Sequence, residues 1–142
     1  VDVELAHEFR YREPVLTPNT LVVSISQSGE TMDTLMAVKY AREQGARTLS
    51  ICNTQGATIP RESDAIVYTH AGPEVAVAST KAFVAQITAC YLFGLQLAQA
   101  RETLSTDAVR ALVADLQKVP DQLREVLTSG DRIAELAHWM AD

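Results

Sequence analysis

The pattern of apolar and polar residues in the first half of the chain predicts strands that alternate with helices. Three short runs are rich in apolar and β-branched side chains, which is typical of buried strands, and they cover residues 21–26, 47–52 and 64–68. Between the first two runs, apolar residues return at helical spacing over residues 31–44, and Gly45 is placed to end that helix. This order predicts a parallel α/β sheet, in which ligands bind beyond the carboxyl ends of the strands.

Finer features of this sheet also follow from the pattern. The nearly continuous apolar run at residues 21–26 predicts the central strand, covered on both faces. In the helix after it, we expect one apolar face that consists of Met32, Leu35, Met36 and Tyr40. A short helical turn is expected at residues 59–62. Residues 53–56 fit either turn chemistry or ligand contacts, with a structural turn as the default.

At the start of the chain, apolar and polar residues alternate with a period of two residues. Residues 1–5 alternate between apolar and acidic side chains, which predicts a half-exposed strand at the edge of the sheet. A short helical turn over residues 7–11 is expected to follow it.

The second half of the chain is predicted to be helical. A helix over residues 79–100 is apolar nearly all round, so part of its surface is expected to meet a partner subunit. Gln86, Thr88 and Gln96 interrupt it, and we expect it to fall short of a membrane span. Later helices are expected to be capped at Ser105 or Thr106, interrupted or restarted at Pro120 and broken at Ser129-Gly130.

Composition and charge narrow the functional classes. The chain has 142 residues, of which 47% are hydrophobic and 21% charged, as expected for one globular domain. Its formal net charge of -6, with dispersed basic residues, argues against a nucleic-acid-binding surface. Cys52 and Cys90 are too few for a disulfide framework, and they are expected to be free thiols of a cytoplasmic protein. The three histidines (His7, His70 and His138) show no metal-ligand spacing, so no metal or other cofactor is predicted.

Candidate chemistry gathers directly after the first strand, at residues 26–31. Ser26, Ser28 and Thr31 supply hydroxyl groups, Gln27 supplies an amide, and a helix is predicted to begin immediately after them. The free backbone N–H groups and positive dipole end of a helix N-terminus attract phosphate. Gly29 permits a close approach of the backbone, and the loop has no Lys or Arg, so it would bind through neutral dipoles.

Two readings of this loop stay open on the residues alone. The Walker-type loop is excluded because its lysine is missing, and the dinucleotide fingerprint because two of its glycines are missing. Ser, Gln and Gly between a strand and a helix are also ordinary capping and turn residues. The residues of the loop therefore fit phosphate binding and simple helix capping about equally well, although four potential donors exceed the needs of a cap.

A second loop precedes the apolar helix. Gly72-Pro73 predicts a turn, and Ser79 or Thr80 is an ordinary helix N-cap. Like the first loop, it follows a predicted strand, so the two loops are expected at the same edge of the sheet.

Three segments occur in the order found in one known family. They are Glu8-Phe9-Arg10-Tyr11-Arg12, the SQSGET sequence of residues 26–31, and the EVAVASTKAF sequence of residues 74–83. Together they strongly resemble the first sugar isomerase (SIS) domain of the glutamine–fructose-6-phosphate aminotransferases, also called glucosamine-6-phosphate synthases. The resemblance covers nearly the whole chain. It implies an α/β three-layer sandwich with a mainly parallel, flavodoxin-like sheet flanked by helices.

The resemblance also implies a function. Family members make glucosamine 6-phosphate from fructose 6-phosphate and glutamine, and this part of them binds the sugar phosphate. Carried over residue by residue, the implied ligand-binding residues are Ser26, Gln27, Ser28 and Thr31 on the first loop, with Val77, through its backbone, and Ser79 on the second. Glu74 and Lys81 are weaker candidates that can simply pair with neighbours.

The implied domain organisation places the rest of the machinery outside this chain. An SIS domain lacking its first strand–helix unit is expected at residues 1–104, followed by a helical linker at 105–142 that leads toward a second SIS domain. The glutaminase and the catalytic residues of the isomerase have no match here, so the chain alone is expected to be an inactive piece of a longer protein. The resemblance further implies a homodimer, whereas the expectation that it binds neither nucleic acid nor a membrane rests on the charge and on the interrupted apolar helix. A phosphosugar-sensing SIS module of a regulatory protein is the alternative.

Overall fold

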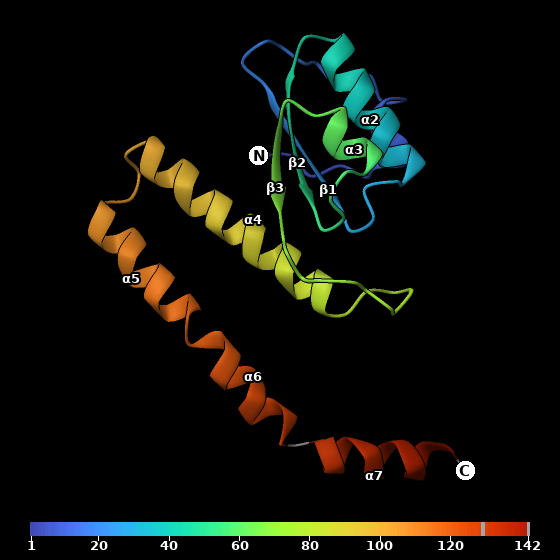
Figure 1. Ribbon diagram of the computed structural model, residues 1–142. Coiled ribbons are helices and arrows are strands. Elements are labelled where there is room, and N and C mark those ends of the chain that lie inside the picture. Colours follow the sequence, from blue (N-terminus) through green and yellow to red (C-terminus); the bar gives the residue numbers. More distant parts are fainter. Residues whose placement is uncertain (129, 142) are drawn as a thin grey trace. The chain divides into compact units, whose positions relative to one another are not determined.

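The computed structural model describes residues 1–128 and 130–141 (Figure 1). Contacts between residues divide the chain into two compact units, Val1–Phe93 and Gly94–Asp142. The boundary predicted at residue 104 stays a prediction. Of the predicted break at Ser129-Gly130, Ser129 lies outside the described residues, and Gly130 is the first residue of a helix.

The first unit is built on a parallel sheet of three strands, as predicted. The strands are β1 (Leu21–Ser26), β2 (Arg47–Cys52) and β3 (Ala65–Tyr68), in the order β1-β2-β3. Ile25 pairs in register with Ile51, and Ile51 with Val67. The expectation that residues 21–26 form the central strand is wrong for the described sheet, because β2 has a neighbour on each side and β1 forms an edge.

Two helices cover one face of this sheet (Figure 1). Helix α2 (Met32–Glu43) begins after the N-cap Thr31, and Gly45 follows its C-cap with a φ of 81°. The short helix α3 (Thr58–Arg61) confirms the predicted turn. Leu35 and Val38 of α2 form a buried cluster with Ile59 of α3.

The predicted apolar side of α2 is confirmed in part. Leu35 is buried, and Met36 and Tyr40 are half-buried, whereas Met32 is 64% exposed and does not belong to this side. The other buried residues of the helix are Thr34, Ala37, Val38 and Ala41. Strand β1 is not covered on both faces, because Leu21 and Ile25 remain exposed.

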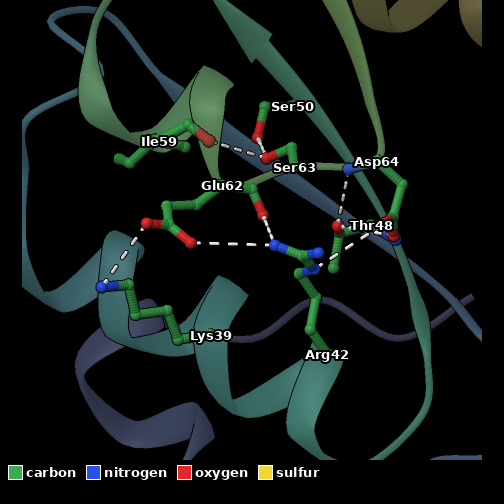
Figure 2. A network of polar contacts seen from close by, with 8 residues as sticks. All are labelled: Lys39, Arg42, Thr48, Ser50, Ile59, Glu62, Ser63 and Asp64. Atoms are coloured by element: carbon green, nitrogen blue, oxygen red, sulfur yellow. Dashed lines mark hydrogen bonds and ion pairs between the residues drawn. The ribbon is translucent and has the colours of Figure 1, made fainter.

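Polar side chains fill part of the space between the sheet and these helices (Figure 2). The hydroxyl oxygens of Ser24 and Ser50 lie 2.6 Å apart, and Ser50 also contacts the hydroxyl of Ser63. Thr48 donates from both its backbone N–H and its hydroxyl to Asp64, at 2.8 and 2.9 Å. These hydrogen bonds hold the pKa of Asp64 below its usual range. Buried hydroxyl groups are tolerated here because they satisfy one another.

Charged residues close this network at the surface (Figure 2). The Arg42 guanidinium donates to the Glu62 carbonyl oxygen at 2.8 Å and lies 3.7 Å from the carboxylates of both Glu62 and Asp64. Lys39 lies 3.7 Å from the Glu62 carboxylate. The network therefore fixes the segment between α3 and β3 against α2.

The start of the chain is the main departure from the predicted elements. Residues 1–5 have no regular secondary structure, so the predicted edge strand is wrong. A strand needs a hydrogen-bonded neighbour, and this segment pairs with none of the three described strands. The predicted helical turn is present as α1 (Ala6–Phe9), and Phe9 packs edge-to-face on Tyr40 with ring centroids 6.1 Å apart.

In the described residues after β3 lie the helices α4 (Lys81–Ala100), α5 (Thr106–Leu116), α6 (Val119–Leu127) and α7 (Gly130–Ala141). The Ser105 hydroxyl caps α5 by accepting from the Ala108 N–H at 3.2 Å, and Pro120 lies in the first turn of α6, as predicted. By length and composition α4 is apolar enough to cross a membrane, which corrects the expectation that its polar residues exclude this. Length and composition are weak grounds by themselves, because core helices that never meet a membrane pass the same criteria.

Candidate functional site

The first predicted loop lies where its sequence pattern places it, between the carboxyl end of β1 and the N-terminus of α2. Ser26 ends the strand and is buried, whereas Thr31 is the exposed N-cap residue of α2. The Thr31 side chain makes no capping hydrogen bond, so its hydroxyl is not used to start the helix. Helix α2 has 12 residues, long enough for its N-terminus to provide donors and a favourable dipole.

Hydroxyl groups shape this loop from within. Ser26 Oγ accepts a hydrogen bond from the Gly29 N–H at 3.0 Å, and Ser28 Oγ accepts from the Glu30 N–H at 3.2 Å. A hydroxyl that accepts still has its own proton to donate. Both serines therefore hold the loop in shape and keep a donor for a ligand.

The carbonyl groups of the loop turn toward the segment that joins β2 to α3. The Gln27 carbonyl oxygen accepts from the N–H groups of Asn53 and Thr54 at 3.2 and 3.3 Å. The Gly29 carbonyl oxygen accepts from the Ile59 N–H at 2.9 Å. In a planar trans peptide the next N–H points opposite to the carbonyl. The Ser28 N–H consequently faces away from this segment, whereas the Glu30 N–H is already bonded to Ser28 Oγ.

Gly29 is required at its position for two reasons. Its φ is 70°, a left-handed conformation that disfavours other residues. An added Cβ would lie 2.6 Å from Ala57 Cβ and 2.7 Å from Cys52 Sγ, which is closer than side chains pack. The loop thus rests directly on the β2–α3 segment. Burial raises the pKa of the Cys52 thiol in this contact, so the thiol stays neutral.

Glu30 adds a further attachment to α3. Its carboxylate accepts from the Thr58 N–H at 2.8 Å. Hydrogen bonds from the side chain and the backbone of Thr58 lower the pKa of Glu30. The carboxylate is consequently ionised at neutral pH and engaged with α3.

The second loop is tied to the same edge of the sheet by Asn53. The Asn53 side-chain oxygen accepts from the Thr69 hydroxyl and the Ala71 N–H, both at 2.9 Å, and its amide donates to the Gly72 carbonyl oxygen at 2.8 Å. Since its backbone also binds Gln27, Asn53 contacts both loops. The residues alone marked this position as a turn, and no pattern in the sequence indicated its link to the second loop.

The sequence-predicted residues therefore form two groups. Ser26, Gln27, Ser28 and Thr31 lie together on the first loop. Val77 and Ser79 lie on the second, where the Val77 side chain is fully exposed and Ser79 has a φ of 66°. Thr80 directly precedes α4, as one of the two predicted N-cap positions, but the capping side chain is that of Glu74, whose carboxylate accepts from the N–H groups of Thr80 and Ala82 at 2.9 and 3.0 Å.

Across residues 1–128 and 130–141 no group of three or more His, Cys, Asp or Glu residues is arranged to hold a metal ion. Both cysteines are free, Cys52 buried and Cys90 half-buried. The chemistry available at the two loops is therefore hydrogen bonding to an oxygen-rich ligand. The one carboxylate of the first loop, that of Glu30, is engaged with the Thr58 N–H of α3.

Comparison with known proteins identifies the family. The sequence model of the SIS domain matches residues 1–96. The chain belongs to the SIS domain family. It is 72% identical over 142 residues to a glutamine–fructose-6-phosphate aminotransferase from Leifsonia xyli, covering 100% of this chain and 23% of that protein. The chain therefore spans about a quarter of the length of the curated relatives it matches.

Solved structures share the fold of this chain. The C-terminal domain of glucosamine-fructose-6-phosphate aminotransferase from Francisella tularensis matches with a TM-score of 0.93 and 35% identity, over 99% of this chain and 40% of that one. A putative phosphosugar isomerase from Clostridium difficile matches with a TM-score of 0.79 and 27% identity, over 83% of this chain and 34% of that one. The predicted α/β sandwich with a parallel sheet flanked by helices is thereby confirmed.

Proposed function

We propose that this SIS domain binds the sugar phosphate in the isomerase region of a glutamine–fructose-6-phosphate aminotransferase. In this account the ligand is fructose 6-phosphate or glucosamine 6-phosphate, and the full-length protein is a cytoplasmic homodimer. The glutaminase and the isomerase acid–base groups belong to parts of the protein beyond these residues. Names of relatives at up to 72% identity support this assignment over the alternative of a regulatory sugar-phosphate sensor.

One observation carries the proposal. The first loop directs the Ser28 N–H away from the β2–α3 segment, just before α2, and adds hydroxyl protons of Ser26, Ser28 and Thr31. Converging neutral donors at a helix N-terminus fit a phosphate group. A loop without Lys or Arg also suits a phosphorylated substrate that must be released after reaction.

The test is sugar-phosphate binding by Ser28→Ala and Thr31→Ala variants of the full-length protein. Each variant loses one neutral hydrogen bond to phosphate, so the free energy of binding should weaken by about 0.5–1.5 kcal/mol. Calorimetry with fructose 6-phosphate measures this change directly. Glu43→Gln, an exposed substitution at the far end of α2, is the control and should leave the affinity unchanged. Unchanged affinity in both loop variants would remove the proposal.

A further inference from the structure

One carboxylate gathers the donors of the second loop. Besides the N–H groups of Thr80 and Ala82, the Glu74 oxygens accept from the Thr80 hydroxyl at 3.1 Å, the Ala76 N–H at 3.3 Å and the Ser79 hydroxyl at 3.4 Å. These donors lie both before and inside the first turn of α4. The side chain of Glu74 consequently folds residues 75–80 around itself and joins them to the helix.

The charge of Glu74 suits this position. A carboxylate is stabilised by the positive end of a helix dipole and by the free N–H groups there. Hydrogen bonds from the backbone N–H groups of Thr80 and Ala82 lower the pKa of Glu74 to about 2. The N-terminus of this 20-residue helix is thus already satisfied by an internal anion, unlike the N-terminus of α2.

The same contacts set the chemistry of Ser79. This residue has a left-handed φ of 66°, and its N–H donates to the Ala76 carbonyl oxygen at 3.0 Å. Such a conformation is unfavourable for a residue other than glycine and persists only when surrounding contacts enforce it. Because the Ser79 hydroxyl proton points to Glu74, the lone pairs of its oxygen remain to accept a hydrogen bond from a sugar hydroxyl.

We propose that Glu74 is a positioning residue that shapes the second loop, so that the Val77 backbone and the Ser79 oxygen meet the sugar while the first loop alone receives the phosphate. This inference rests on the proposed function. It separates the site into two parts: removal of the Glu74 carboxylate should impair recognition of the sugar and spare recognition of phosphate.

The experiment compares two probes on the full-length protein and its Glu74→Gln variant. The variant keeps the size of the side chain. Its amide nitrogen, however, is a donor and cannot accept hydrogen bonds from the N–H and hydroxyl donors of the loop. We expect the dissociation constant for fructose 6-phosphate to rise about tenfold, equal to about 1.4 kcal/mol. The dissociation constant for inorganic phosphate should stay within about twofold, because all the hydrogen bonds of the Glu74 carboxylate go to residues 76–82 and none to the first loop.

A second variant guards against a folding defect. Glu74→Asp keeps the charge on a shorter side chain and should lose less fructose 6-phosphate affinity than Glu74→Gln, whereas Glu43→Gln should leave both affinities unchanged. The inference is overturned if both ligands weaken by the same factor, or if neither weakens in the two Glu74 variants. A wild-type protein that binds neither ligand would overturn the proposed function itself, and this inference with it.

Discussion

Individual side chains decide the chemistry of this fold through hydrogen bonds that the sequence pattern does not reveal. Asn53 was expected in a structural turn, yet it contacts both loops. Glu74 was a weak candidate for a ligand contact and instead caps α4. Such links depend on residues that only the folded chain brings together, so composition and spacing could not predict them.

The Glu74 carboxylate provides a prediction for pH. Its pKa of about 2 in the fold lies below the ordinary value of 4.5, so folding favours the ionised form. Its contribution to stability should be present above about pH 4.5 and disappear as the pH falls toward 2. Carbon-13 NMR of the Glu74 carboxyl should show a midpoint near 2. A midpoint near 4.5 would show that the capping hydrogen bonds are absent in solution.

Among the elements, the regular strands and helices followed the sequence pattern closely. Strands β1 and β2 have the predicted bounds, and α2, α3 and β3 lie within one residue of them at each end. The predictions fail for polar residues that are buried between two elements. Ser24, Thr48 and Ser50 are buried because they hydrogen-bond to other hydroxyl or carboxyl groups, which hydrophobic periodicity does not detect.

The residues of the first loop predict its place in the chain, but they do not predict which segment it packs against. Hydroxyl groups before a predicted helix indicated an anion site. The sequence does not predict the hydrogen bonds from the β2–α3 segment to the Gln27 and Gly29 carbonyl oxygens. These hydrogen bonds depend on the packing of two loops more than twenty residues apart.

Packing of the first loop on α3 is tested by Gly29→Ala with Gly45→Ala as its matched control. Both glycines have a positive φ, but an added Cβ at Gly45 meets nothing within 4 Å. Gly45→Ala should lower the free energy of unfolding by about 1–2 kcal/mol for the backbone conformation alone. Gly29→Ala adds a clash with Ala57 and Cys52, so it should lose about 1–3 kcal/mol more and also weaken fructose 6-phosphate binding. Denaturant unfolding measures both, and equal losses would contradict the contact.

For the whole molecule, the exposed surface of α4 leads to a prediction about association. Apolar side chains that are at least 41% exposed recur along this helix, namely Phe83, Val84, Ile87, Tyr91, Leu92 and Leu97. Exposed apolar surface of this extent usually marks an interface, and homo-oligomers commonly pair with two-fold symmetry.

Light scattering on the chain with and without residues 105–142 tests this prediction. We expect a dimer in both forms, which would place the interface on α4 or on an edge of the sheet. A monomer in the longer form would instead favour cover by the helices that follow Ser105.

The chain alone should not catalyse the reaction of its relatives. It spans 23% of the length of the aminotransferase from Leifsonia xyli, and the first loop supplies no acid–base pair for isomerisation. A purified chain incubated with glutamine and fructose 6-phosphate should form no glucosamine 6-phosphate. Turnover above that of a heat-inactivated sample would contradict this assignment.

A crystal structure of the full-length protein with fructose 6-phosphate would show where the phosphate group binds. We expect phosphate oxygens within about 2.7–3.2 Å of the Ser28 backbone nitrogen, with the Ser26, Ser28 or Thr31 hydroxyl groups as further donors. A phosphate group bound elsewhere on the domain, with the loop at residues 26–31 making no contact to it, would contradict the account.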